Sequence, residues 1–418
     1  MIQTTLRTLC TILLLLLFAA KSYGQESPRF LIERIDVRNT KRVSPAIVVA
    51  ESRLDVNRTY TEQELREAAD RLQRLPFLLD AQFSLEKGSV RDAFVLVISV
   101  QETKPFFFHA DLLQYWNEDR GALVESETGA LVGFRWFVGR KGAFHVGIEG
   151  EEDRTLGNQS YDPTEAQVGY TQYDLFGTRA FATVNLRYQL PNTSAWESSR
   201  ITPAVVVGVP LTPRQTLTLS YAASHIEYEP ARFAPFKREH SEDAVRLRWS
   251  YNTTNHPFFP TSGAAYSVTP LFISSDGTTF GIQVNQNGEI EPLSFGSHAY
   301  GVELGAAKYW EVSERNSVSI TGRGGLLETS SDPDAPPFAF EYRRSYGDVR
   351  VGYSHSLWDA ARRAVDGESR IEANAGIERA YLETSRGNPG GANRYRTSVS
   401  WVRRNTWGTL RLGVGYAW

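Results

Sequence analysis

The last twelve residues, 407–418, read WGTLRLGVGYAW, and this stretch decides the fold. From residue 410 onward apolar side chains recur at every second position, with small or polar side chains between them. The apolar positions are Leu410, Leu412, Val414, Tyr416 and Trp418. A period of two places them on one face of a β-strand. Such a strand ending on an aromatic residue is typical of the last strand of a membrane β-barrel, and a soluble sheet is the alternative. We take Leu412, Val414, Tyr416 and Trp418 as the carboxy-terminal strand signal.

Residues 1–24 have the pattern of a signal peptide. Arg7 gives a positive start, residues 11–20 (TILLLLLFAA) form an apolar run too short for a comfortable membrane span, and small residues precede the expected cleavage before Gln25. A transmembrane anchor is the alternative interpretation. Because no later apolar run reaches 18 residues, we expect any further membrane crossing to use strands, and we expect the bacterial outer membrane as the location.

Composition argues against several classes of function. The net charge is -3 and the basic residues are spread along the chain, so we expect no nucleic acid partner. The single cysteine, Cys10, lies in the segment expected to be removed. The sequence contains no His-Glu-x-x-His, Gly-x-Ser-x-Gly or phosphate-loop motif. We therefore expect no catalytic residues, cofactor or metal, and no enzyme activity; a barrel enzyme using Ser, His and Asp at the rim of the lumen is the alternative.

Residues 25–104 have the pattern of a small α+β domain. Strands are expected at 30–37, 77–85 and 93–100. Ser44 and Pro45 mark the start of one helix, as N-cap and first helical residue. Thr61 and Glu64 form a capping box for a second helix, whose apolar residues recur at helical spacing until Pro76.

The β-α-α-β-β order and several short motifs resemble a POTRA (polypeptide-transport-associated) domain. The motifs are Ile35-x-Val37-x-Asn39, Leu54, Tyr60-x-x-x-x-Leu65, Leu72-x-x-Leu75-x-Phe77 and Val97-x-Ser99-Val100-x-Glu102. Arg38 departs from the pattern, because a glycine usually precedes the Asn. The resemblance implies a periplasmic domain that binds extended polypeptide by strand addition to a sheet edge. A spacer that only positions the barrel is the alternative.

Beyond Lys104 the sequence changes to short alternating segments separated by turns. One parity is apolar, as in Val132, Phe134 and Trp136, and the other is polar or small. Polar positions expected to face a wet lumen are Arg135, His145, Glu149, Asn185, Arg187, Arg246, Arg248, Arg394 and Arg396. A soluble sandwich has the same periodicity, but the signal peptide and the lack of a covering amphipathic helix favour a membrane barrel. We predict an antiparallel transmembrane β-barrel over 105–418.

The connections alternate in length, which is typical of outer-membrane barrels. Tight turns are expected at 139–142, 176–179, 212–215 and 313–316, and long polar loops at 154–165, 191–200, 229–242 and 329–346. We count fifteen segments, from 106–116 to 410–418, and a weak sixteenth within 278–291. If both chain ends lie in the periplasm, the strand number must be even. We therefore predict sixteen strands, with fourteen as the alternative.

Residues 249–263 (WSYNTTNHPFFPTSG) are similar to a turn of the POTRA-plus-barrel assembly and translocation superfamily, which includes BamA, TamA and the two-partner secretion transporters. In that superfamily a strand ends in an Asp- or Asn-containing segment and turns through Pro-Thr-x-Gly. Here Pro260, Thr261 and Gly263 occupy those places. Proline fixes φ, and glycine accepts backbone conformations that other residues avoid.

Residues 336–353 resemble the long sixth loop of the superfamily, which folds back into the barrel with an Arg-Gly-(Phe/Tyr) tip. Either Arg344-Ser345-Tyr346 or Arg350-Val351-Gly352-Tyr353 stands in for that tip. By this resemblance the loop arginine pairs with a carboxylate on an inward strand face. The matching segment offers Asn374 in place of Asp, so Glu372 or Glu378 is the alternative partner. Arginines that are merely solvated in the lumen are the other interpretation.

The resemblance implies an outer-membrane protein that helps to insert or translocate polypeptides. By this resemblance the expected partners are the outer-membrane lipid bilayer, unfolded or extended polypeptide clients and accessory envelope lipoproteins. A passive pore or scaffold derived from the same architecture is the alternative.

Overall fold

The computed structural model describes residues 28–117, 122–153, 164–189, 198–228, 238–256, 259–284, 290–331, 342–359, 366–384 and 390–417. The expected signal peptide lies outside these residues, as do most of the expected long loops. Within them, no helix is both long enough and apolar enough to cross a membrane.

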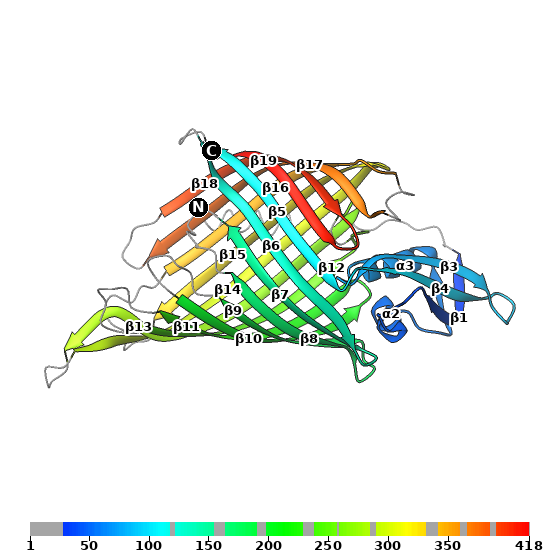
Figure 1. Cartoon of the computed structure of the whole chain (residues 1–418), viewed down its shortest axis with the longest axis horizontal. Coiled ribbons are helices and arrows are strands. Elements are labelled where there is room, and N and C mark those ends of the chain that lie inside the picture. The colour runs from blue at the N-terminus through cyan, green and yellow to red at the C-terminus, as the bar shows by residue number, and fades with distance from the viewer. Residues whose placement is uncertain are drawn as a thin grey trace.

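The amino-terminal part is a four-stranded sheet with two helices, which we call the α/β unit (Figure 1). The sheet order is β2-β1-β4-β3, with β1 parallel to β4 and the other pairs antiparallel. Its elements are β1 (Arg29–Arg38), α2 (Pro45–Ser52), β2 (Arg58–Thr61), α3 (Glu62–Gln73), β3 (Leu78–Lys87) and β4 (Ala93–Glu102).

Local signals explain the two helices of the α/β unit. Ser44 accepts a hydrogen bond from the amide of Ala46 as N-cap of α2, and Thr61 and Glu64 form both halves of the predicted capping box at α3. The helices pack on the sheet around fully buried side chains such as Ile47, Leu72 and Leu96. Strand β2 was not predicted, because its four residues carry no apolar alternation.

The rest of the described chain forms a closed β-barrel. Its strands are β5 (Phe106–Asn117), β6 (Ala122–Val138), β7 (Gly142–Asp153), β8 (Glu165–Leu175), β9 (Ala180–Gln189), β10 (Ser198–Thr212), β11 (Gln215–Tyr228), β12 (Arg238–Asn252), β13 (Gly263–Val284), β14 (Ile290–Ser313), β15 (Asn316–Ser331), β16 (Tyr342–Ser356), β17 (Glu368–Thr384), β18 (Gly390–Arg404) and β19 (Gly408–Ala417). Each strand pairs antiparallel with the next, and β19 closes the barrel against β5.

The closing pair corrects the predicted strand number. The barrel has fifteen strands, neither sixteen nor fourteen, because β19 runs parallel to β5 from Gly408↔Phe108 to Ala417↔Asn117. An odd number of strands in an otherwise antiparallel barrel requires one parallel pair. Strand β5 therefore begins at one rim and β19 ends at the other, so the expectation of an even number was wrong. The weak extra segment at 278–291 belongs to the long hairpin of β13 and β14.

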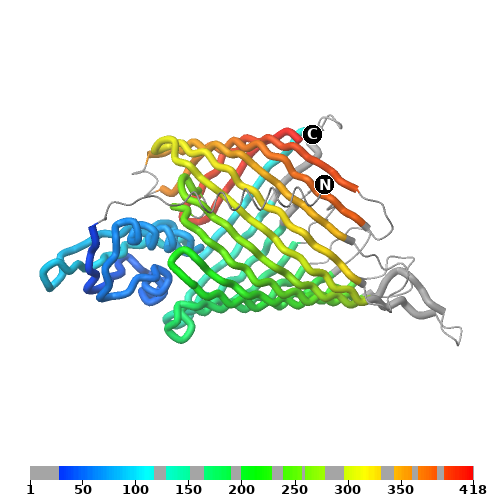
Figure 2. The backbone as a smooth tube through the Cα atoms, turned by 180° about the vertical axis from the view of Figure 1, so that it is seen from behind, coloured from blue at the N-terminus to red at the C-terminus, as the bar shows by residue number. Residues whose placement is uncertain are grey.

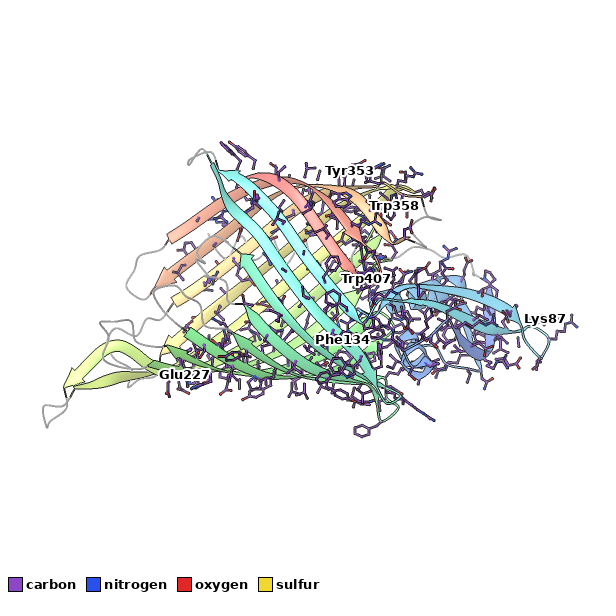
Figure 3. The ribbon with its side chains drawn as sticks, viewed as in Figure 1. Lys87, Phe134, Glu227, Tyr353, Trp358 and Trp407 are labelled. Carbon is purple, nitrogen blue, oxygen red and sulfur yellow. The ribbon has the colours of Figure 1, made fainter. Side chains whose placement is uncertain are left out.

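The two faces of the barrel wall differ as predicted. Large apolar side chains of one parity are exposed on the outside, for example Phe134 and Tyr353, which project from the barrel in Figure 3. Side chains of the other parity face the lumen and are polar, small or packed on one another. An apolar outer wall around a polar interior is the arrangement of barrels that sit in lipid.

The α/β unit lies against the rim that carries the tight turns (Figures 1 and 2). Phe77 of the unit makes edge-on ring contacts with Phe137 at 5.2 Å and Tyr173 at 5.8 Å, both from the barrel. Arg53 donates to the carbonyl oxygens of Thr212 at 2.7 Å and Pro213 at 3.2 Å in the β10–β11 turn. The unit is thus fixed to the rim by ring packing and by hydrogen bonds from guanidinium groups to turn carbonyls.

Candidate functional site

The segment expected to be a long loop is mostly strand. Arg344, Tyr346, Arg350, Gly352 and Tyr353 all lie in β16. The alternation of Val349, Val351 and Tyr353, which are exposed on the outer face, explains why a strand forms here. The loop interpretation is therefore corrected from residue 342 onward, and the connection at 332–341 lies outside the described residues.

Arg350 finds its carboxylate on its own strand. Its Nε lies 3.4 Å from Oδ2 of Asp348, and Nε of Arg323 on β15 lies 2.5 Å from Oδ1 of the same residue. Asp348 is buried, whereas both arginines are partly exposed. Asp348 was missed from the sequence, although its position two residues before Arg350 places both on the lumen face.

The three candidate partners on β17 face the same lumen. Gly352 lies opposite Asn374 and Asp348 opposite Glu378 in the β16–β17 ladder. Glu372 accepts a hydrogen bond from Nη2 of Arg411 at 3.2 Å, and Glu378 lies 4.0 Å from Arg396. The two glutamates therefore contact arginines of β19 and β18, and the role of Arg344 or Arg350 in a loop lock stays a prediction.

Side chains on the lumen side also join the two strands of the closing seam. Arg411 on β19 lies 3.7 Å from Asp111 on β5 as well as 3.2 Å from Glu372 on β17. Leu113 and Tyr115 of β5 are buried and lie over Gly413 and Gly415, where an added Cβ would come within 2.8 and 2.4 Å of their side chains. The alternating glycines of the carboxy-terminal stretch thus make room for large side chains across the seam.

The start and the outer face of β19 complete the seam. A Cβ at Gly408 would lie 1.7 Å from the carbonyl oxygen of Phe108, so this close approach of two backbones requires glycine. Leu412 and Val414 are exposed on the outside, and Tyr416 shares their parity. Trp418 lies outside the described residues.

A pocket lies in the lumen beside the seam. Leu113 and Tyr115 of β5 and Asn374 and Gly376 of β17 are among the residues that line it. Its charged lining comprises Asp348, Arg350, Glu378, Arg394, Arg396 and Arg411. Mixed charges hold the strands together and give the lumen a polar surface. The described residues contain no group of three His, Cys, Asp or Glu side chains that could hold a metal ion.

The predicted Pro-Thr-x-Gly turn joins β12 to β13 on the rim that carries the α/β unit. Oδ1 of Asn255 accepts hydrogen bonds from the amides of Thr261 at 3.0 Å and Ser262 at 3.2 Å, and Pro260 precedes them. Gly263 has φ of +99°, and a Cβ there would lie 2.2 Å from the carbonyl oxygen of Thr253. The turn therefore depends on glycine at this position.

A closed barrel with an apolar outer wall, a charged lumen and an α/β unit on one rim defines a class of outer-membrane-type barrel proteins. A family model described as the Omp85 superfamily domain matches residues 141–355, just over half of the chain. The chain belongs to the Omp85 superfamily. Membership implies an outer-membrane location.

Among the solved structures that resemble the chain are two with low sequence identity. One is BamA from Haemophilus ducreyi lacking POTRA domains 1–3, with 12% identity, a TM-score of 0.48 and coverage of 94% of this chain and 81% of that chain. The other is CdiB from Escherichia coli, with 12% identity, a TM-score of 0.39 and coverage of 91% and 85%. No curated protein matches the sequence. The family assignment rests on the family model.

Proposed function

We propose that this protein assists the insertion or translocation of polypeptides at the bacterial outer membrane. The observation that carries the proposal is the Omp85 family match over the barrel. The apolar outer wall supports a barrel that crosses the lipid bilayer, and the position of the α/β unit on one rim supports a periplasmic receiving domain. In this proposal residues 1–24 are the signal peptide, 25–104 the POTRA-like periplasmic domain and 105–418 the outer-membrane barrel.

The α/β unit receives the client by strand addition. The sheet order places β3 at an edge, where one side pairs with β4 and the other side is open to an added strand among the described residues. Gln82, Ser84 and Glu86 along this edge are exposed and polar. An edge of this kind binds extended polypeptide mainly through backbone hydrogen bonds, so it accepts clients of differing sequence.

The seam between β5 and β19 supplies a strand edge in the barrel wall. The seam is the parallel pair of the barrel, and parallel pairing is slightly less stable per residue than antiparallel pairing. Opening it exposes unpaired backbone groups, which are costly in lipid and would pair readily with a client strand. Accessory envelope lipoproteins are further partners in this proposal.

A cross-link across the seam tests the proposal. Leu112 and Leu412 are register partners across the seam, and both are exposed on the outer face. The single native cysteine is Cys10, so a Leu112→Cys, Leu412→Cys pair can be joined with a short bifunctional maleimide. We expect client insertion to fall to background when this pair is joined.

A matched pair away from the seam serves as the control. Leu219 and Leu247 are register partners on β11 and β12 and are equally exposed. Joining a Leu219→Cys, Leu247→Cys pair should leave insertion unchanged. Full activity with the seam joined would rule out the opening of β5 from β19.

A passive pore or scaffold is the second candidate function. It is favoured by Asn374 in place of the carboxylate that the superfamily pattern leads us to expect, and by the pairing of Arg350 with Asp348 on its own strand. A pore conducts through its lumen and has no need to open its wall. The same seam cross-link therefore separates the two candidates, because it would leave a pore fully active.

A further inference from the structure

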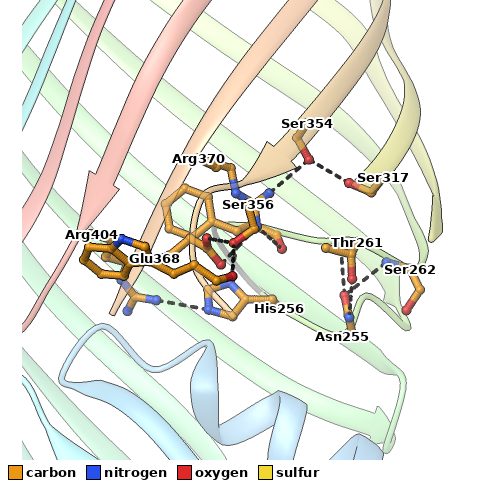
Figure 4. A network of polar contacts seen from close by, with 12 residues as sticks. Asn255, His256, Thr261, Ser262, Ser317, Ser354, Ser356, Glu368, Arg370 and Arg404 are labelled. Carbon is orange, nitrogen blue, oxygen red and sulfur yellow. Dashed lines mark hydrogen bonds and ion pairs between the residues drawn. The ribbon is translucent and has the colours of Figure 1, made fainter. Parts of the chain in front are cut away.

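The β12–β13 connection contacts strands β17 and β18 as well as its own strands. Strands β14, β15 and β16 separate it from β17 and β18 in the barrel order. Figure 4 shows His256 beside Arg404 and Glu368, at the barrel end that faces the α/β unit. We call residues 253–256 and 259–262 the latch segment.

Arg370 of β17 holds the latch segment to the wall. Its guanidinium carbon lies 4.5 Å from the ring centre of Phe259, and its Nη2 lies 3.5 Å from the carbonyl oxygen of Phe259. Arg370 is 3% exposed and Phe259 is 4% exposed. Glu368 and Ser354 contact the same guanidinium at 3.4 Å. A cation–π interaction is most stabilising when the cation and the ring are both shielded from water, as they are here.

Arg74, the C-cap residue of α3, holds the latch segment to the α/β unit. Its Nη2 donates to the carbonyl oxygen of Thr254 at 2.7 Å. Thr254 is buried, and Asn252 accepts hydrogen bonds from its amide and its hydroxyl group. The accepting carbonyl is therefore fixed in place by the turn itself.

Arg404 of β18 links the barrel wall to both the α/β unit and the latch segment. Its Nη2 donates to the carbonyl oxygen of Leu78 in the α/β unit at 3.2 Å, and its Nη1 lies 3.5 Å from Nε2 of His256. The amide of Phe259 donates to Nδ1 of His256 at 2.9 Å, which orients the imidazole ring. The α/β unit, the latch segment and the wall thus each contact the other two.

Two of these three arginines are almost completely buried, Arg370 at 3% and Arg404 at 4% exposure. A buried guanidinium is tolerated only while its contacts persist, so the loss of one contact leaves a buried charge less well satisfied. A closed set of contacts of this kind favours two discrete arrangements, all formed or all released.

We propose that the latch segment couples the docking of the α/β unit to the β17–β18 wall, so that release of the unit frees the latch segment from Arg370. Thermodynamic linkage makes the coupling reciprocal: freeing Phe259 from Arg370 must also loosen the unit. The proposal concerns conformation alone and holds for any client.

Hydrogen exchange on the full chain in detergent micelles tests the coupling. We expect Arg74→Ala to raise exchange at least tenfold in the latch segment and also at residues 368–370, which Arg74 does not touch. Arg66→Ala is the matched control, because Arg66 lies on the same helix and pairs with the exposed Glu62. It should change neither region.

The reciprocal variant is Phe259→Leu, which keeps an apolar side chain and removes the ring face. We expect exchange to rise at residues 75–79 of the α/β unit. The exchange rates of the double variant should exceed those of the stronger single variant by less than twofold, because both substitutions release the same set of latch-segment contacts. Effects that multiply, or an Arg74→Ala effect confined to α3 and the latch segment, would overturn the proposal. Far-ultraviolet circular dichroism confirms that each variant retains its strand content.

Discussion

Arg214, in the turn between β10 and β11, grips the carboxylate of Glu67 on α3 with two hydrogen bonds, 2.8 Å from Nε and 2.7 Å from Nη2. Burial by itself would raise the pKa of Glu67, but the hydrogen bonds from Arg214 and Gln63 and the charges of Arg214 and Arg71 outweigh it, so the pKa is lowered. The carboxylate therefore stays ionised where the α/β unit meets the rim.

Breaking this pair should loosen the α/β unit. Glu67 is 10% exposed, but Arg214 is 45% exposed, so we take the lower part of the range for charged hydrogen bonds. Arg214→Ala should weaken the docking of the α/β unit on the rim by about 1–2 kcal/mol. Hydrogen exchange of the α3 amides measures the loss. Arg66→Ala, which breaks an exposed pair on the same helix, should cost less than about 0.5 kcal/mol. Equal effects of the two variants would show that the Arg214 contact does not fix the unit.

The stability of the docked α/β unit should also depend on pH. Burial raises the pKa of Glu51 to about 7 against the opposing charge of Arg53, and burial raises the pKa of Asp70 to about 7 against the charge of Arg74. A carboxyl group with a raised pKa in the folded state binds more protons there than in the unfolded state. Folded stability from these two groups is thus greatest below their unfolded pKa values and falls as pH rises toward 7.

We expect the temperature at which the α/β unit unfolds to fall by a few degrees between pH 5 and pH 8. Glu51→Gln should flatten this dependence, because an amide does not ionise. The measurement is a thermal melt in which hydrogen exchange of the α/β-unit amides is recorded at each temperature. An unfolding temperature of the α/β unit that rises with pH would contradict the raised pKa of these two carboxyl groups.

Glycine at position 408 should be required for closure of the barrel. A Cβ there would lie 1.7 Å from the carbonyl oxygen of Phe108, so Gly408→Ala must push β19 away from β5. We expect Gly408→Ala to lose its resistance to unfolding in SDS, seen as a change of mobility between heated and unheated gel samples. Gly129→Ala is the control, because an added Cβ there meets no atom within 4 Å. Unchanged mobility of Gly408→Ala would mean that β19 does not close the barrel in this register.

Removal of the carboxylate between Arg323 and Arg350 should weaken the wall at β15–β16. Asp348→Asn leaves two neighbouring guanidinium groups without their shared charge partner. The arginines are 58% and 41% exposed, so water offsets part of the loss and we expect about 1–2 kcal/mol. Denaturant unfolding monitored by tryptophan fluorescence measures it. A wild-type midpoint would show that Asp348 does not stabilise the wall.

Much of the fold could be predicted because its signals are local. The capping box of Thr61 and Glu64, the helix start at Ser44 and the alternation in β19 each depend on a few neighbouring residues. The predicted strand number was wrong because it assumed that the first strand begins and the last strand ends at the same rim, whereas β5 and β19 pair in parallel. The prediction of a loop at 342–353 was wrong because a family resemblance was preferred over the alternation of Val349 and Val351.

The site was harder to predict because its contacts join distant parts of the chain. Glu372 was a candidate, but its partner Arg411 follows from the register of three strands. Asp348 could have been found from its spacing to Arg350. The contact of Phe259 with Arg370 crosses the barrel end and leaves no sequence spacing to read.

Depletion of the protein in its host, followed by quantitative proteomics of the outer membrane, tests the central claim most directly. If the protein assists insertion or translocation, the amounts of other outer-membrane barrel proteins should fall several-fold before growth slows. Unchanged amounts of those proteins, together with altered permeability to small solutes, would contradict the claim and identify a passive pore.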